Sequence, residues 1–282
     1  MKKIKTYFEL IKFEHTVFAL PFAYLGMWVA AKGAPGWKVF LLVTLVMAGA
    51  RSAGMTLNRL IDMHLDAKNP RTKNRSLVTG EFKTQWAWLA VGVGIAVLFL
   101  GSALLNPLCL KLAPLALFIL TAYHYAKRFT FFCHWILGLV LGCAPMGGWI
   151  AVTGQFAWQP VLLALAVTTW VGGFDILYSA QDMDFDRVSG LHSVPVRYGL
   201  AKALWAAAAS HGLSIFFFAC FGWTAGLGWV YAVGLCVTAV LLRIEHSLVT
   251  EDDLSKINTA FFTINGWIGV LLFVFTGIDL YR

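Results

Sequence analysis

Residues 85–105 have the sequence QWAWLAVGVGIAVLFLGSALL, an apolar stretch without a charged side chain. An α-helix needs about 20 consecutive apolar residues to cross the hydrocarbon core of a bilayer. The chain of 282 residues contains about nine such stretches; 59% of its residues are hydrophobic and only 13% are charged. Soluble globular domains carry about 25% charged residues. The composition therefore excludes a disordered chain and predicts an all-α, polytopic membrane protein.

The predicted transmembrane helices leave no room for a separate soluble domain, so residues 1–282 are expected to form a single transmembrane domain. The expected spans are residues 15–32, 37–60, 85–105, 107–127, 131–153, 159–181, 201–223, 226–245 and 258–280. Eight further spans follow the first one, so we expect it to be retained as a helix and not removed as a signal peptide.

Lysine and arginine residues lie mainly on one side of the predicted spans. Sixteen of the 22 lie on the side of the N-terminus. Two of the other six, Arg51 and Arg59, lie within the second span. The remaining four lie on the opposite side: Lys32, Lys38, Lys111 and Arg282. Cytoplasmic loops carry an excess of these residues. We therefore expect a multi-pass protein of the cell (inner) membrane with a cytoplasmic N-terminus, and the net charge of +8 does not indicate nucleic-acid binding.

Two loops on the predicted cytoplasmic side, roughly 62–84 and 182–200, hold an unusual share of the acidic residues. At the edge of the first loop, Asn58, Asp62 and Asp66 are spaced four residues apart. If the second span continues through this segment as a helix, the three side chains share one face.

A second acidic cluster ends the sixth span. It consists of Asp175, Tyr178, Asp182 and Asp186. Asp62 and Asp182 are 120 residues apart, and so are Asp66 and Asp186. This repeat indicates an internal duplication of four helices. The predicted fold is therefore two pseudo-repeated four-helix halves followed by a C-terminal helix.

The clusters predict a metal site. Carboxylates at i and i+4 repel each other, and the cost rises near a bilayer, so a compensating cation is expected. Oxygen ligands without a cysteine suit Mg²⁺, which commonly bridges carboxylates to substrate phosphates. Nearby cations would neutralise these phosphates: Arg71, Lys73, Arg75, Lys127, Arg128 and Arg197. We therefore expect a metal–diphosphate site between the two clusters, facing the cytoplasm. Asp175 is singled out further because it lies inside an apolar span.

The two clusters resemble the motifs of the UbiA superfamily of intramembrane prenyltransferases, NDxxDxxxD after the second span and DxxYxxxDxxxD after the sixth. The second motif is matched in full, whereas the first has Arg59 in place of the usual aspartate. Arg59 either leaves the metal with fewer protein oxygens or contacts the diphosphate directly. The resemblance spans essentially the whole chain and is greatest to the 4-hydroxybenzoate polyprenyltransferase branch, including a menaquinone-linked subgroup.

The resemblance implies Mg²⁺-dependent transfer of a polyprenyl group from polyprenyl diphosphate to a ring carbon of a hydroxybenzoate-type or naphthoate-type aromatic acid, in ubiquinone or menaquinone biosynthesis. The implied metal ligands are Asp62, Asp66, Asp182 and Asp186. The implied catalytic residues, at the inner end of the pocket, are Asn58, Asp175 and Tyr178. The implied substrate-binding residues are Arg59, Arg71, Arg75, Lys127, Arg128 and Arg197. The expected partners are the two substrates and the lipid bilayer; no nucleic acid is expected, and no protein partner is indicated.

Three alternatives remain at this point. A cation-coupled secondary transporter would also use intramembrane acids and repeated halves, but its site should lie near the bilayer midplane. Here most of the acids lie at the cytoplasmic end, together with lysines and arginines. A CDP-alcohol phosphotransferase would carry a DG pair with a downstream AR, which these clusters lack. A protohaem farnesyltransferase of the same superfamily is the third alternative.

Overall fold

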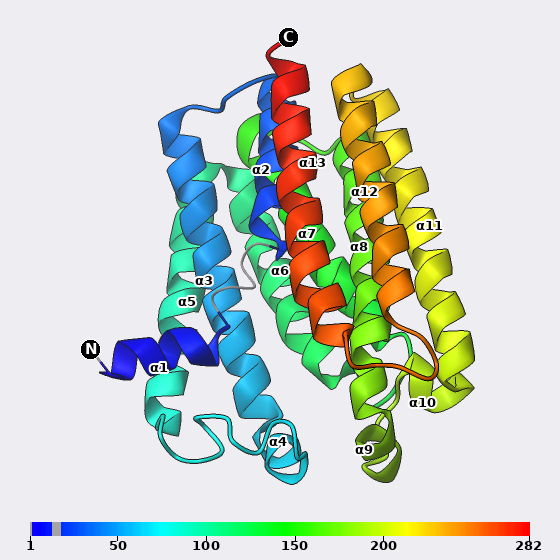
Figure 1. The fold of residues 1–282 in the computed structure, drawn as a ribbon. Coiled ribbons are helices and arrows are strands. Elements are labelled where there is room, and N and C mark those ends of the chain that lie inside the picture. Colours follow the sequence, from blue (N-terminus) through cyan, green and yellow to red (C-terminus); the bar gives the residue numbers. More distant parts are fainter. Residues whose placement is uncertain (1, 13–17) are drawn as a thin grey trace. The chain divides into compact units, whose positions relative to one another are not determined.

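Every regular element of the computed structural model is a helix, over the residues that it describes, which are 2–12 and 18–282 (Figure 1). Eight of these helices are long and apolar enough to cross a membrane. A further apolar helix, α2 (Leu20–Ala31), is shorter, and the start predicted for this span at residue 15 lies outside the described residues. The predicted all-α, polytopic membrane fold is confirmed.

The chain divides into two compact units. The first unit contains α1 (Lys2–Leu10), α3 (Trp37–Ile61), α4 (Met63–Lys68), α5 (Thr84–Leu105) and most of α6 (Pro107–Ala126), as far as His124. Helices α3 and α5 lie side by side (Figure 1). Glycine permits this approach, because a Cβ atom on Gly49 would lie only 2.8 Å from the carbonyl oxygen of Gly94. Such close backbone packing drives helix association in lipid, where burial of apolar side chains gains little.

Helix α1 lies across the end of α3 that leads into α4 (Figure 1). The hydroxyl groups of Tyr7 and Ser52 form a hydrogen bond between α1 and α3. The end of α1 is also buried in a small apolar cluster of Leu10, Ile11, Leu77, Phe82 and Ala87. The sequence analysis did not predict this helix, because its residues are too polar and too few to form a membrane span.

The second unit contains the remaining helices: α2, α7 (Cys133–Thr153), α8 (Trp158–Ser179), α9 (Met183–Val188), α10 (Val194–Tyr198), α11 (Leu200–Thr224), α12 (Trp229–Leu248) and α13 (Asn265–Leu280). A 3₁₀ turn, η2 (Ala180–Asp182), precedes α9, and a π-helix, η3 (Thr259–Ile264), precedes α13. The spanning helices form a closed ring in the order α2, α7, α8, α11, α12 and α13, with α13 again in contact with α2.

Helix α2 belongs to the second unit although it precedes α3 in the sequence. Glycines at its contact with α7 explain this position. A Cβ atom on Gly26 would lie 2.2 Å from the carbonyl oxygen of Pro145, and one on Gly148 would lie 2.1 Å from that of Ala23. The two four-helix repeats along the sequence therefore do not coincide with the two units in space. The prediction of one transmembrane domain over residues 1–282 stays a prediction.

Aromatic side chains fill the interior of the second unit. The rings of Phe22 and Trp170 lie 5.0 Å apart, and Phe218 stacks on Phe22 at 5.9 Å. All three side chains are fully buried. The indole Nε1 of Trp170 donates a hydrogen bond to the Asn265 side chain at 2.8 Å, so the polar edge of this large ring is satisfied within the core.

The predicted spans agree with the helices to within a few residues, with one informative shift. The span predicted at 226–245 is α12, which begins only at Trp229. The reason is the turn after α11, in which Gly226 has a φ of +69° and the backbone N–H of Leu227 donates a hydrogen bond to the Gly222 carbonyl. The left-handed glycine conformation ends one helix and prevents the next from starting earlier.

Candidate functional site

The first acidic cluster lies at a break between two helices. Asp62 separates α3 from α4 and has φ −95° and ψ 3°, a sparsely populated backbone conformation. Helical hydrogen bonds nevertheless continue through the break: the N–H of Asp62 donates to the Asn58 carbonyl at 3.0 Å, and the N–H of Asp66 donates to the Asp62 carbonyl at 2.8 Å. The condition of one continuous helix is therefore not met at Asp62, where the backbone leaves the helical conformation.

The second acidic cluster repeats this break. Asp182 ends η2, precedes α9 and has φ −99° and ψ 3°, within a few degrees of the values at Asp62. Each break is followed by a helix of 6 residues whose first turn carries the next acid of the motif, Asp66 in α4 and Asp186 in α9. The 120-residue repeat in the sequence is thus matched by a repeat in backbone conformation.

The acids of the first unit are nearly inaccessible to solvent. Asp62 is 2% exposed and Asp66 is 7% exposed. The amide Nδ2 of Asn58 donates to Asp62 Oδ2 at 3.3 Å. Arg75 Nη1 lies 2.6 Å from Asp66 Oδ2, a charge-assisted contact that holds the loop after α4 against the carboxylate. The structure thus brings together four of the predicted site residues of this unit.

Arg59, which replaces the usual aspartate, is bound by structural partners. The residue is 8% exposed; its Nε donates to the Leu10 carbonyl at 3.3 Å, and its Nη1 donates to Asn58 Oδ1 at 3.1 Å. Arg59 therefore ties the end of α1 to the first motif, and its contact with a diphosphate stays a prediction. The side chain of Arg71 is exposed, and its backbone N–H donates to the buried Asn69 at 2.8 Å.

The sequence analysis missed one residue of the first cluster, His124 on α6. It is buried, and its Nδ1 lies 3.2 Å from Asn58 Nδ2. Because Nδ2 is a donor, His124 Nδ1 accepts this hydrogen bond. His124 could have been identified in the same way as Asp175, because both are titratable residues inside an apolar span.

In the second unit, Asp175 on α8 is paired with His134 on α7. His134 Nδ1 lies 2.7 Å from Asp175 Oδ2, and His134 Nε2 accepts a hydrogen bond from the backbone N–H of Val194 at 3.2 Å. The acceptor role of Nε2 leaves the ring proton on Nδ1, so His134 donates to the carboxylate. His134 is 2% exposed, and the sequence analysis missed it as well.

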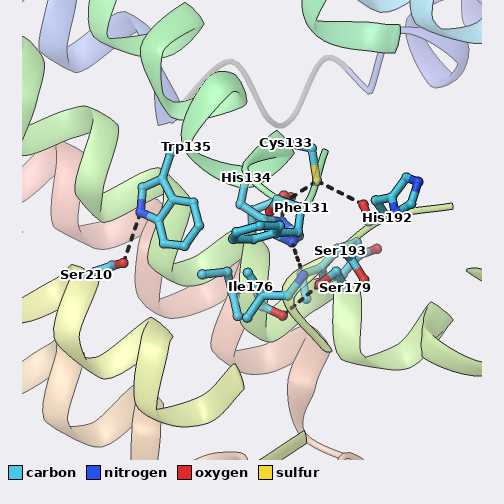
Figure 2. A network of polar contacts seen from close by, with 12 residues as sticks. Phe131, Cys133, His134, Trp135, Ile176, Ser179, His192, Ser193 and Ser210 are labelled. Carbon is cyan, nitrogen blue, oxygen red and sulfur yellow. Dashed lines mark hydrogen bonds and ion pairs between the residues drawn. The ribbon is translucent and has the colours of Figure 1, made fainter. Parts of the chain in front are cut away.

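The loop between α9 and α10 is fastened beside the start of α7. Figure 2 shows Cys133, His134, His192 and Ser193 gathered there. Cys133 Sγ contacts the His192 carbonyl at 3.4 Å, and the His192 N–H donates to the Lys127 carbonyl at 2.7 Å. Ser193 Oγ accepts from the Val196 N–H at 3.3 Å, which caps α10. These contacts fix the backbone that presents Lys127 and Arg197.

The predicted cations of the second unit lie at this same end. The guanidinium of Arg197 is exposed and stacks on Phe131 at 4.5 Å from the ring centroid. That of Arg128 lies over Tyr125 at 5.1 Å, and Lys127 is half-buried beside it in the sequence. Aromatic stacking holds a guanidinium in place without neutralising its charge. Arg197 therefore remains able to attract an anion.

Tyr178 belongs to an aromatic surface that the sequence analysis did not foresee. Its ring centroid is 4.1 Å from that of Phe261 and 6.0 Å from that of Phe262, both on η3. Phe261 also contacts Phe174 at 5.2 Å, and Phe174 contacts Phe18 at 5.9 Å. Here π-helical winding replaces the first turns of the span predicted as a regular helix at 258–280, and such segments are frequent at functional sites.

The donor set of both motifs fits Mg²⁺. In residues 2–12 and 18–282, no group of three or more His, Cys, Asp or Glu side chains converges on a common point. Each unit instead offers a pair of aspartates, buried in the first unit and half-buried in the second. Mg²⁺ keeps several waters and takes one or two carboxylates together with substrate phosphates, so a pair is sufficient. The approach of the two pairs to each other stays a prediction.

Comparison with known proteins places this architecture in a family. The model of the UbiA prenyltransferase family matches residues 19–267. The 4-hydroxybenzoate octaprenyltransferase of Methylobacillus flagellatus is 29% identical over 276 residues, which are 97% of this chain and 93% of that protein.

Solved structures have the same fold. The apo structure of a UbiA homologue from Aeropyrum pernix K1 is similar with a TM-score of 0.86 at 34% sequence identity, covering 94% of this chain and 98% of the other. A UbiA homologue from Archaeoglobus fulgidus, solved with GPP and Mg²⁺, is similar with a TM-score of 0.76 at 20% identity, covering 98% and 100%. At that identity the second likeness concerns the fold alone. The chain belongs to the UbiA prenyltransferase family and is a membrane-embedded prenyltransferase.

Proposed function

We propose that the protein transfers a polyprenyl group from polyprenyl diphosphate to a ring carbon of a hydroxybenzoate-type or naphthoate-type aromatic acid, with Mg²⁺, in ubiquinone or menaquinone biosynthesis. The observation that carries the proposal is the break with the same backbone conformation at Asp62 and Asp182, which is followed in each unit by the next aspartate of the motif. The relative from Methylobacillus flagellatus, named for octaprenyl transfer to 4-hydroxybenzoate, supports this substrate class.

The charged residues hold and release the diphosphate. In this proposal Asp62, Asp66, Asp182 and Asp186 would bind Mg²⁺, and the Archaeoglobus fulgidus homologue solved with GPP and Mg²⁺ makes that metal the natural candidate. When bound, Mg²⁺ supplies positive charge to the departing diphosphate. The cations that add to it are Arg59, Arg71, Arg75, Lys127, Arg128 and Arg197. Arg75 has a second role, since its contact with Asp66 orients that carboxylate.

The aromatic residues protect the reacting carbon. The allylic C–O bond breaks as the diphosphate leaves, which places positive charge on the terminal prenyl carbon. The faces of Tyr178 and Phe261 stabilise a cation of this kind and exclude the water that would capture it. A C–C bond then forms with the acceptor ring, and the ring carbon passes its proton to the released diphosphate.

Asn58, Asp175 and Tyr178 act on the acceptor in this proposal. His134 donates to one oxygen of the Asp175 carboxylate and leaves the other oxygen for a hydrogen bond with the phenol of the acceptor. This contact increases the electron density of the ring as the new bond forms. His134 is accordingly a positioning residue, which acts through Asp175.

The charge pattern supports the membrane orientation. Most lysines and arginines lie on the side of the N-terminus, which we propose is cytoplasmic. Both acidic motifs follow spans that end on this side, so the active site would open to the cytoplasm of the cell (inner) membrane.

Prenyl transfer by the purified protein in lipid nanodiscs tests the proposal. We expect labelled polyprenyl diphosphate to be joined to 4-hydroxybenzoate or to a naphthoate, and excess EDTA to stop the reaction. Protohaem with farnesyl diphosphate is the comparison arm, because a protohaem farnesyltransferase belongs to the same superfamily. Transfer to protohaem alone, or full activity in excess EDTA, would contradict the proposal. Membership in a prenyltransferase family already sets aside the cation-coupled transporter.

A further inference from the structure

A groove separates α11 from α12 on the outside of the second unit. Its volume is about 460 Å³, and the two helices lie side by side along it (Figure 1). The α11 wall contains the small residues Ala208 and Gly212 among larger ones such as Leu204 and Ile215. The α12 wall contains Ala239 and Leu242. The acidic motifs and the aromatic surface around Tyr178 contribute no residue to it. The groove is therefore an apolar channel of its own, open to the surroundings of the helices.

An arginine lies at one end of this groove. Arg243 on α12 is exposed, and among the described residues it makes no hydrogen bond or ion pair. The groove lining contains no carboxylate. A guanidinium on the outer face of a membrane helix is costly unless an anion meets it or it reaches the headgroup region. The groove thus combines an apolar channel with one positive charge that lacks a counter-ion from the protein.

The depth of Arg243 in the membrane matches that of Trp205, which also lines the groove and is 78% exposed. Trp205 lies five residues after the start of α11, and Arg243 lies five residues before the end of α12. At 1.5 Å per residue, both lie about 7.5 Å from the helix ends on the side of the second acidic motif, which belongs to the same unit. Tryptophan is enriched at the level of the lipid headgroups, so the two side chains mark the interface on that side.

Histidines fix the polar edge of the groove. His211 Nε2 lies 3.2 Å from the Trp170 carbonyl, so this nitrogen donates, and His211 Nδ1 then accepts from His246 Nε2 at 2.9 Å. His246 follows Arg243 by three residues, slightly less than one helical turn, and both residues line the groove. The bond to a fully packed histidine holds the His246 ring in place, which makes the groove preformed at its charged end.

We propose that the groove binds one anionic glycerophospholipid of the leaflet on this side. Its phosphate pairs with Arg243, its glycerol and ester region lies beside Trp205, and one acyl chain occupies the channel along Ala208 and Gly212. A phosphodiester with a single negative charge matches the single arginine. A prenyl diphosphate carries more charge and requires the carboxylates and metal that this groove lacks. The proposal is independent of the reaction assigned to the acidic motifs.

Native mass spectrometry of the purified full-length protein in a mild detergent tests the lipid site, with phosphatidylglycerol and phosphatidylcholine of identical acyl chains as probes. The wild-type protein is expected to bind one phosphatidylglycerol more tightly than phosphatidylcholine. Arg243→Gln should weaken phosphatidylglycerol binding by about tenfold and leave phosphatidylcholine binding unchanged. Lys256→Gln, the same charge change at an exposed loop residue on the same side, is the matched control and should change neither affinity.

A second variant tests the channel itself. A Cβ atom at Gly212 would meet no atom within 4 Å, so Gly212→Leu places a side chain into the groove without a backbone clash. This substitution also replaces glycine by a better helix former, so a folded protein is expected. It should weaken the binding of both lipids. The proposal is overturned if Arg243→Gln binds phosphatidylglycerol as tightly as Lys256→Gln does, or if Gly212→Leu leaves the binding of both lipids unchanged. It is also overturned if added farnesyl diphosphate displaces phosphatidylglycerol from the wild-type protein and the Arg243→Gln variant no longer binds farnesyl diphosphate.

Discussion

His134 Nδ1 donates to Asp175 Oδ2 at 2.7 Å, and this contact joins α7 to α8 within the second unit. The backbone N–H of Val194 donates to the other ring nitrogen at 3.2 Å, so the first residue of α10 determines which nitrogen carries the proton. The orientation of Asp175 therefore depends on a residue that belongs to neither acidic motif.

Loss of the His134 donor is expected to lower turnover without weakening substrate binding. His134→Leu should reduce kcat by about 10- to 100-fold, the range typical for residues that orient an active group. The KM for polyprenyl diphosphate should stay within about twofold of wild type. His134→Asn retains a side-chain donor and should recover part of the rate. Equal kcat values for His134→Leu and the wild-type protein would contradict the role assigned to this contact.

The acids of the two motifs are expected to be essential in both units. Asp66→Asn and Asp182→Asn each remove a negative charge while keeping the side-chain shape, and each should reduce prenyl transfer by more than about 100-fold. Asp184→Asn is the matched control, because Asp184 lies between Asp182 and Asp186 in the sequence but is exposed and pairs with Arg187 at 4.0 Å. Steady-state transfer assays on protein recovered from membranes measure the difference. Full activity of Asp182→Asn would refute its role as a metal ligand.

The sequence alone predicted the spans and the acidic motifs, because both depend on local patterns. An apolar run of about 20 residues has one stable solution in a bilayer, and the four-residue spacing of the acids follows directly from the helix period. The break at Asp62 could not be predicted in this way, since the four-residue spacing of the acids is also compatible with a continuous helix. His134 and His124 were missed because their partners lie 41 and 66 residues away in the sequence.

Arg59 is expected to stabilise the N-terminal helix. Arg59→Met preserves much of the side-chain length but removes the hydrogen bonds to the Leu10 carbonyl and to Asn58. Hydrogen bonds from charged groups contribute about 1.5–3 kcal/mol, so α1 should detach more readily and the melting temperature should fall. Limited proteolysis near residue 12 measures the detachment. Tyr7→Phe removes the bond to Ser52 and should show a smaller effect in the same direction. Unchanged proteolysis of both variants would show that α1 is held by its apolar cluster alone.

Phe261 is expected to decide whether the activated prenyl group reaches the acceptor or reacts with water. Its ring covers Tyr178 at 4.1 Å and Phe174 at 5.2 Å, so Phe261→Ala opens a space beside the proposed position of the reacting carbon. Water that enters this space can capture the allylic cation. The ratio of prenyl alcohol to prenylated acid should therefore rise several-fold. This change corresponds to a loss of about 1 kcal/mol in the difference between the activation free energies of the two reactions. Phe216→Ala, at an exposed position on α11, is the control and should leave the product ratio unchanged. If both variants keep the wild-type ratio, then Phe261 packs the helices without shielding the reaction, and the aromatic surface around Tyr178 has no part in excluding water.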